Sequence, residues 1–287
     1  MKKLSRIVAK LILTLVFMSV YTTLMAQKVQ SVQEGSIWAP ATVKIDGKLT
    51  EWGATLSAYN KNVKLWYTIA NDDKNIYLAI KSTDLDNNNK ILAGGISFTL
   101  NTDDKKKSKN AFIITFPIIN RSGVRTGRGG GGIRRGGGFG KDDTQDTAAI
   151  AAQQKQTLAT SKEISAIGFA AITDTLISIY NEYSIKAVAS VDNKGVLVYE
   201  LAIPIKLLNI AAGSQKELAY NIKLNGLTLN VGMNISAGNL SISGGGGGFG
   251  NGGGGGGFGG GRGSDISDMM SPTDFWGKYT LAIKPSN

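Results

Sequence analysis

Residues 63–82, VKLWYTIANDDKNIYLAIKS, decide the fold class because apolar side chains fall on every second position on both sides of a polar centre. Residues 63–69 have the two-residue period of a β-strand with one buried face, and residues 76–80 repeat it. Residues 71–75 are rich in Asn and Asp, which favour tight turns. The stretch therefore predicts an antiparallel β-hairpin.

The same alternation recurs along the chain, at residues 96–100, 112–116, 185–189, 197–201, 220–224 and 227–235. One buried and one solvated face per strand is typical of an antiparallel β-sandwich, so we expect an all-β fold. One short surface helix is predicted over residues 144–160, which are rich in Ala and Gln and contain no Gly or Pro. A single helical turn is expected at residues 204–208, where proline suits the first position.

The first 26 residues are typical of a secretory signal peptide, with a basic start, an apolar run over residues 11–20 and Ala26 at the expected cleavage point. The alternative is an uncleaved anchor, but the run is shorter than the roughly 20 residues that cross a bilayer. We therefore expect an exported protein, periplasmic or extracellular, with no stable membrane insertion after cleavage. Residues 27–287 are predicted to form one sandwich domain. The chain has no cysteine, which excludes disulfides.

Two glycine-rich insertions, at about residues 121–141 and 243–264, interrupt the strand pattern. They carry too few apolar side chains to offset the entropy of ordering, so we predict two disordered loops. Arginines in the first insertion would suit RNA, but an exported protein rarely meets it. The formal net charge is +11 over the whole chain, with lysines scattered rather than gathered in one stripe. We therefore expect no nucleic-acid partner.

Four motifs follow one another in a recognisable order: KIDGKLTEWG (44–53), YTIANDDKNIYLAIKSTD (67–84), GGISFTLNTDD (94–104) and VYELAIPIKLL (198–208). In this order the chain resembles the carbohydrate-binding module family 9-like domains, which are DOMON-like β-sandwiches of secreted bacterial proteins. The resemblance runs from about residue 36 to residue 283. It implies a β-sandwich and a carbohydrate ligand, and it assigns no binding residue with confidence because the loops differ.

The absence of histidine excludes Ser-His-Asp catalysis, histidine-ligated zinc and histidine-ligated haem. Glycoside hydrolysis needs a spaced pair of carboxylates, and the spacing of the acidic residues defines none. Glu51 is expected to bond a turn, and Glu200 to lie beside a lysine of a neighbouring strand. The sequence thus predicts a protein that is not an enzyme.

A structural calcium ion is the one cofactor that the sequence suggests. Asp84, Asp86 and Asn88 occupy alternate positions in TDLDNNNK, like the first ligands of a calcium loop. The match stops after Asn88, because no glycine follows it and Gly95 stands where an EF-hand needs glutamate. The alternative is a solvated acidic turn.

Sugar binding commonly uses aromatic platforms, because the apolar face of a pyranose stacks on an aromatic ring. Alternation places Trp66 and Trp276 on the polar faces of their strands, and Tyr59 lies just before the strand of Trp66. We take these three as candidate ligand-binding residues. The alternative for Trp66 is packing beneath the surface helix or a loop, and Trp52 is expected to be structural.

Two functions remain open on these observations. The first is an exported, non-catalytic glycan-binding protein whose partner is a polysaccharide or an oligosaccharide. The second is a structural or interaction protein of the cell envelope, with a protein partner, that keeps the fold without binding sugar.

Overall fold

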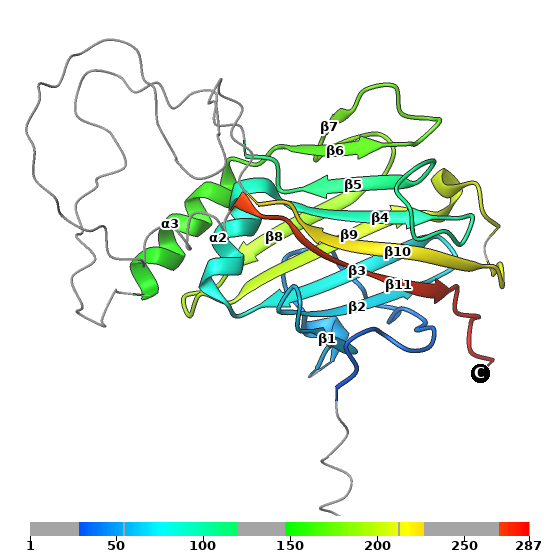
Figure 1. The fold of residues 1–287 in the computed structure, drawn as a ribbon, viewed down its shortest axis with the longest axis horizontal. Helices are drawn as coiled ribbons and strands as arrows, with labels where there is room; N and C mark the ends of the chain where they lie inside the picture. The colour runs from blue at the N-terminus through cyan, green and yellow to red at the C-terminus, as the bar shows by residue number, and fades with distance from the viewer. Residues whose placement is uncertain (1–28, 54, 120–146, 212, 227–269, 287) are drawn as a thin grey trace, which may run out of the picture.

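A computed structural model describes residues 29–53, 55–119, 147–211, 213–226 and 270–286. The described strands form two antiparallel sheets, which confirms the predicted all-β architecture (Figure 1). Sheet A contains, in spatial order, β1 (Ala58–Asn60), β2 (Leu65–Asn71), β3 (Asn75–Ser82), β9 (Leu197–Pro204) and β8 (Lys186–Val191). Sheet B contains β11 (Thr273–Thr280), β10 (Glu217–Leu224), β4 (Ile96–Asn101), β5 (Phe112–Phe116), β6 (Glu163–Ile167) and β7 (Leu176–Ser178). The predicted signal peptide, both glycine-rich insertions and the predicted strand at 227–235 lie outside the described residues.

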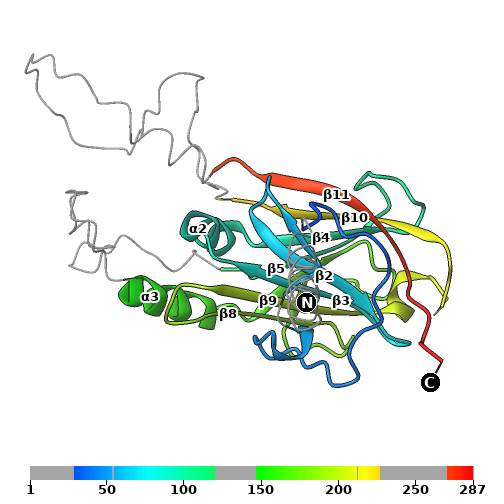
Figure 2. The ribbon, with the colours of Figure 1, turned by 90° about the horizontal axis from the view of Figure 1, so that it is seen from below.

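The two sheets pack face to face, and Figure 2 shows β10 and β11 above β8 and β9. Their inner faces form one hydrophobic core, in which Tyr67, Tyr199 and Tyr220 are the largest fully buried side chains. The hydroxyls of Tyr67 and Tyr220 lie 2.9 Å apart and share a hydrogen bond between the sheets. Each buried hydroxyl thereby gains a partner, which lowers the cost of removing it from water.

The predicted hairpin is β2 and β3, in register from Trp66 opposite Lys81 to Asn71 opposite Ile76. The Oδ1 atom of Asp72 accepts hydrogen bonds of 2.7 Å from the backbone N–H groups of both Lys74 and Asn75. This bonding is the reason that an Asn- and Asp-rich segment forms the turn.

The outer face of sheet A differs from the prediction of one solvated face. Residues 37–53 and 55–56, the covering segment, lie across it, and Trp52, which belongs to the short 3-10 helix η1 (Thr50–Trp52), is buried there. The strands beneath carry small side chains at the covered positions, namely Ala70, Ala79 and Ala202. Small residues let the covering segment approach closely, so β2, β3 and β9 are buried on both faces.

Both predicted helices are present, as α3 (Thr147–Ala159) and the single turn η2 (Ile205–Leu208). Ala151 and Leu158 of α3 are buried in the core, so α3 closes one end of the sandwich instead of lying loosely on its surface. A helix that the sequence did not predict, α2 (Leu85–Gly94), lies at the same end (Figure 1). Within the described ranges, no helix has the length and apolar character needed to cross a membrane.

Candidate functional site

Glu200, on β9 of sheet A, binds the covering segment through three hydrogen bonds. Its side chain is fully buried, and Oε1 accepts a 2.9 Å hydrogen bond from the indole N–H of Trp52. Oε2 accepts the backbone N–H groups of Asp46 at 3.1 Å and Gly47 at 2.8 Å. Burial raises the pKa of the Glu200 carboxyl, while these three donors oppose the rise because they favour the ionised form. The motifs IDG, EW and YELAIP thus form one hydrogen-bonded unit.

This geometry corrects the prediction that Glu200 lies beside a lysine. Its register neighbours are Ala79 on β3 and Val188 on β8. Alternation along a single strand cannot reveal the true partners, because they come from an irregular segment that crosses the sheet. Glu51, by contrast, is half-buried and accepts a 2.9 Å hydrogen bond from the hydroxyl of Thr50.

Gly47 sets how closely this segment approaches β8. Its φ is +82°, and a Cβ added there would lie 3.1 Å from the side chain of Ser190. The hydroxyl of Ser190 also donates a 2.6 Å hydrogen bond to the carbonyl of Gly47. Only glycine meets both demands at this turn.

A cleft of about 820 Å³ opens on the same outer face, beside the covering segment. Its floor includes Tyr77, Ala202 and Lys186, which are in register across β3, β9 and β8. Because the methyl group of Ala202 is flanked by two longer side chains, the floor is hollow at its centre.

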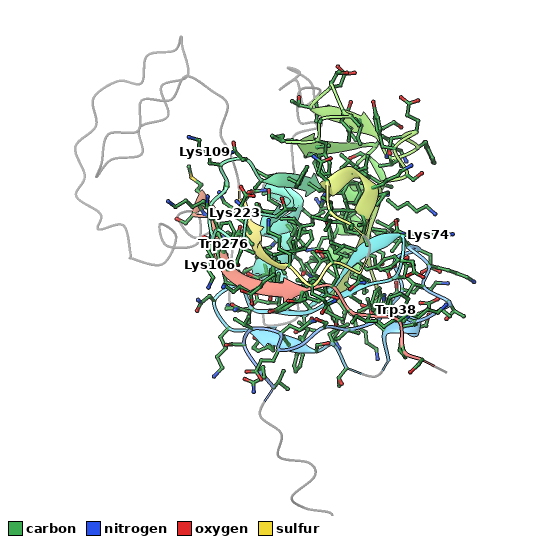
Figure 3. The ribbon with its side chains drawn as sticks, turned by 90° about the vertical axis from the view of Figure 1, so that its right-hand side faces the viewer. Trp38, Lys74, Lys106, Lys109, Lys223 and Trp276 are labelled. Atoms are coloured by element: carbon green, nitrogen blue, oxygen red, sulfur yellow. The ribbon has the colours of Figure 1, made fainter. Side chains whose placement is uncertain are left out.

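The cleft has a basic rim. Four exposed lysines line it, each from a different segment: Lys44, Lys74, Lys186 and Lys206. None of them forms an ion pair with a residue that the structure describes, and Asp73 is the sole carboxylate among the described lining residues. Figure 3 shows Lys74 at this edge of the molecule.

Tyr77 is held rigidly in the floor. Its hydroxyl donates a 2.8 Å hydrogen bond to Oδ2 of Asp72 and accepts one of 3.1 Å from the side-chain amide of Asn75. Its ring packs edge-on against Trp52, with centroids 6.0 Å apart. Burial and the Asp72 carboxylate raise the pKa of the Tyr77 phenol to about 12, so the ring carries no charge at neutral pH.

A second, smaller hollow of about 140 Å³ contains one predicted residue, Trp66, beside Thr55 and Lys81. Tyr59 is directly opposite Trp66 in the β1–β2 ladder, and their ring centroids are 4.9 Å apart. Both rings are half-buried. The structure therefore brings together two of the three predicted aromatic residues, and Trp66 also packs on the covering segment, as the alternative interpretation expected.

Trp276 belongs to a different surface. It lies on β11 opposite Asn221 of β10, and it alternates with the core residues Phe275 and Tyr279. Trp66 and Trp276 hence point outward from opposite sheets. In Figure 3, Trp276 is on the far side of the molecule from Lys74. One small ligand cannot contact both tryptophans.

The acidic segment proposed for calcium is the start of α2, not a loop. Asp84 is the N-cap: Oδ1 accepts the N–H of Asn87 at 3.0 Å, and Oδ2 accepts a 2.9 Å bond from Lys64. Asn88 is buried and donates a 2.7 Å hydrogen bond to the carbonyl of Gly195, whereas Asp86 is exposed. No group of three or more acidic side chains that could hold a metal occurs in the described part of the chain. Calcium binding stays a prediction.

Sequence reasoning did not identify the basic cleft. A signal was present, since Lys44, Lys74 and Lys206 each lie inside one of the four motifs. Their convergence depends on contacts between distant segments, such as the 2.8 Å hydrogen bond from the N–H of Ile205 to the carbonyl of Lys74.

Comparison with known protein families found none that matches this chain, and comparison with curated proteins found no similar sequence.

Proposed function

We propose that this chain is an exported, non-catalytic glycan-binding protein of the family 9 carbohydrate-binding-module type. The observation that carries the proposal is the Tyr59–Trp66 pair, two half-buried rings in contact, of which Trp66 lines a hollow. Such a pair offers a rigid apolar surface to the face of a pyranose. Lys81 and Thr55 beside it supply hydrogen-bond donors for the sugar hydroxyls.

Several residues support a binding role over a catalytic one. Glu200, the most buried carboxylate of the family-like motifs, has both oxygens engaged by structural donors. The chain also has no histidine or cysteine to act as a base or nucleophile. We propose a polysaccharide or oligosaccharide as partner, and the signal-peptide pattern of residues 1–26 supports the proposed export.

The alternative is a structural or interaction protein of the cell envelope. It is favoured by the structural duties of motif residues: Glu200 anchors the covering segment and Asp72 closes the hairpin. Under this alternative, the four motifs preserve the fold alone.

The test is retention on insoluble polysaccharides and on a glycan array, with the full mature chain. Trp66→Ala is expected to weaken binding by roughly 10-fold or more, because it removes the larger ring of the platform. Trp276→Ala is the matched control: it removes the same side chain from the opposite sheet and should leave retention unchanged.

Equal retention by wild type and Trp66→Ala, with both folded, would contradict the proposed platform. If the wild type binds nothing on a broad array, the envelope alternative is favoured.

A further inference from the structure

We infer that the basic cleft beside Tyr77 binds an acidic oligosaccharide, one whose sugar units carry carboxylates, as in uronic acids. That the ligand is a saccharide rests on the proposed function. That it is negatively charged rests on the lysines of the cleft. It concerns a site separate from the Tyr59–Trp66 platform.

Charge is the first argument. Lys44, Lys74, Lys186 and Lys206 come from four segments and surround one cleft, where a single carboxylate, that of Asp73, accompanies them among the described lining residues. Like charges repel, and a cleft with low-dielectric walls concentrates their field. An anionic ligand relieves that repulsion and gains charge-assisted hydrogen bonds, whereas a neutral sugar does neither.

Size and lining select among anions. A volume of about 820 Å³ is within the range of small-molecule sites and far exceeds what an inorganic ion fills. The lining also includes apolar side chains, among them Val43, Ile45 and Ile210, and the Tyr77 ring lies in the floor. A ligand with both apolar faces and carboxylates matches this mixture.

The placement of the charges argues against a nucleic acid. The four lysines, which come from four separate segments, all line one hollow on the outer face of sheet A. Binding of a nucleic acid instead relies on a groove that follows the backbone over several phosphates. A saccharide of a few units fits the confined site better.

The experiment is calorimetric titration of the full mature chain with oligogalacturonate as the probe. The double variant Lys74→Gln/Lys186→Gln is expected to weaken binding by roughly 10-fold or more and to reduce its dependence on salt. The double variant Lys106→Gln/Lys223→Gln is the control. It removes equal charge from around sheet B: Lys223 lies on β10 opposite Asp274 of β11, and Figure 3 shows both lysines on the far side of the molecule from Lys74. It should change affinity less than about 2-fold.

Three results would overturn the inference: no binding of oligogalacturonate by the wild type, equal weakening by both double variants, or equally tight binding of the carboxyl-reduced neutral oligosaccharide. Competition by a short oligonucleotide at equal affinity would reassign the cleft to polyanions in general. Trp66→Ala, run alongside, separates the two proposals: if it loses retention on neutral polysaccharide while the wild type ignores oligogalacturonate, only the cleft is refuted.

Discussion

At the scale of single residues, Glu200 explains why distant motifs occur together in this chain. It bonds Trp52 and Asp46, which lie 148 and 154 positions away along the sequence. Backbone N–H groups that face a sheet need an acceptor, because burying them unpaired costs about 1–3 kcal/mol each. Replacement of Glu200 by a side chain that cannot accept hydrogen bonds would leave three donors without an acceptor.

Glu200→Gln should lower the free energy of unfolding by about 2–4 kcal/mol, because the NH2 of its amide would face N–H donors and could accept from none of them. Urea denaturation followed by circular dichroism measures the loss. Glu51→Gln is the control, with an expected change within about 0.5 kcal/mol, since its described hydrogen bond is to Thr50. Equal stability of both variants would refute the anchoring role.

Alternation predicted correctly that Trp66 points away from the core between the sheets, because its neighbours Leu65 and Tyr67 both point into that core. It could not show that Trp66 and Trp276 lie on opposite sheets, since strand order comes from long-range pairing. The partner of Glu200 was equally hidden, because residues 37–56 have no period to read. The local sequence thus predicts which way a side chain points from its strand. It does not predict which distant residues that side chain contacts.

At the scale of elements, α2 shows why an acidic turn and a helix start are hard to tell apart. Asp and Asn favour both turns and N-caps, since their side chains accept backbone N–H groups in either setting. What decides is burial: Ile91 and Leu92 contribute to the core, and that packing stabilises a helix with three consecutive asparagines. The residue type of Asp84 is typical of an N-cap, but the helix that follows is stabilised by tertiary packing.

Asp84→Ala should destabilise the protein by about 1 kcal/mol, because the N-cap bond to Asn87 is lost. Asp86→Ala is the control, because Asp86 is an exposed residue of the first turn of α2. It should change stability by less than about 0.5 kcal/mol. Thermal melts with EDTA and with Ca²⁺ measure both. A capping role gives the same loss in either buffer. A loss seen only with Ca²⁺ would contradict capping and support the predicted metal site.

At the scale of the whole molecule, the sandwich was predictable and the covering of sheet A was not. A period of two identifies strands, but it cannot show that an aperiodic segment buries their outer faces. The sequence did contain one indication of this covering, the alanines at positions 70, 79 and 202. Small residues in a strand often mark a place where another backbone segment approaches closely. The basic cleft follows from this covering, because Val43 to Ile45 form one of its walls.

The buried tyrosines make the whole fold sensitive to alkali. Burial raises the pKa of Tyr67, Tyr199, Tyr220 and Tyr279 above the ordinary 10.0, and that of Tyr77 to about 12. Once the pH passes 10.0, the unfolded chain releases these protons and the folded chain keeps them, so the free energy of unfolding falls as pH rises. Each such group contributes up to about 1.4 kcal/mol per pH unit.

We therefore expect urea stability to fall steeply from pH 10.0 upward, and the phenolate absorbance of the buried tyrosines to appear cooperatively, together with unfolding. Tyr77→Phe removes one of these protons and should make the fall shallower up to about pH 12. Gradual formation of phenolate while circular dichroism still reports a folded chain would contradict the prediction. It would mean that the buried rings reach solvent while the chain is still folded.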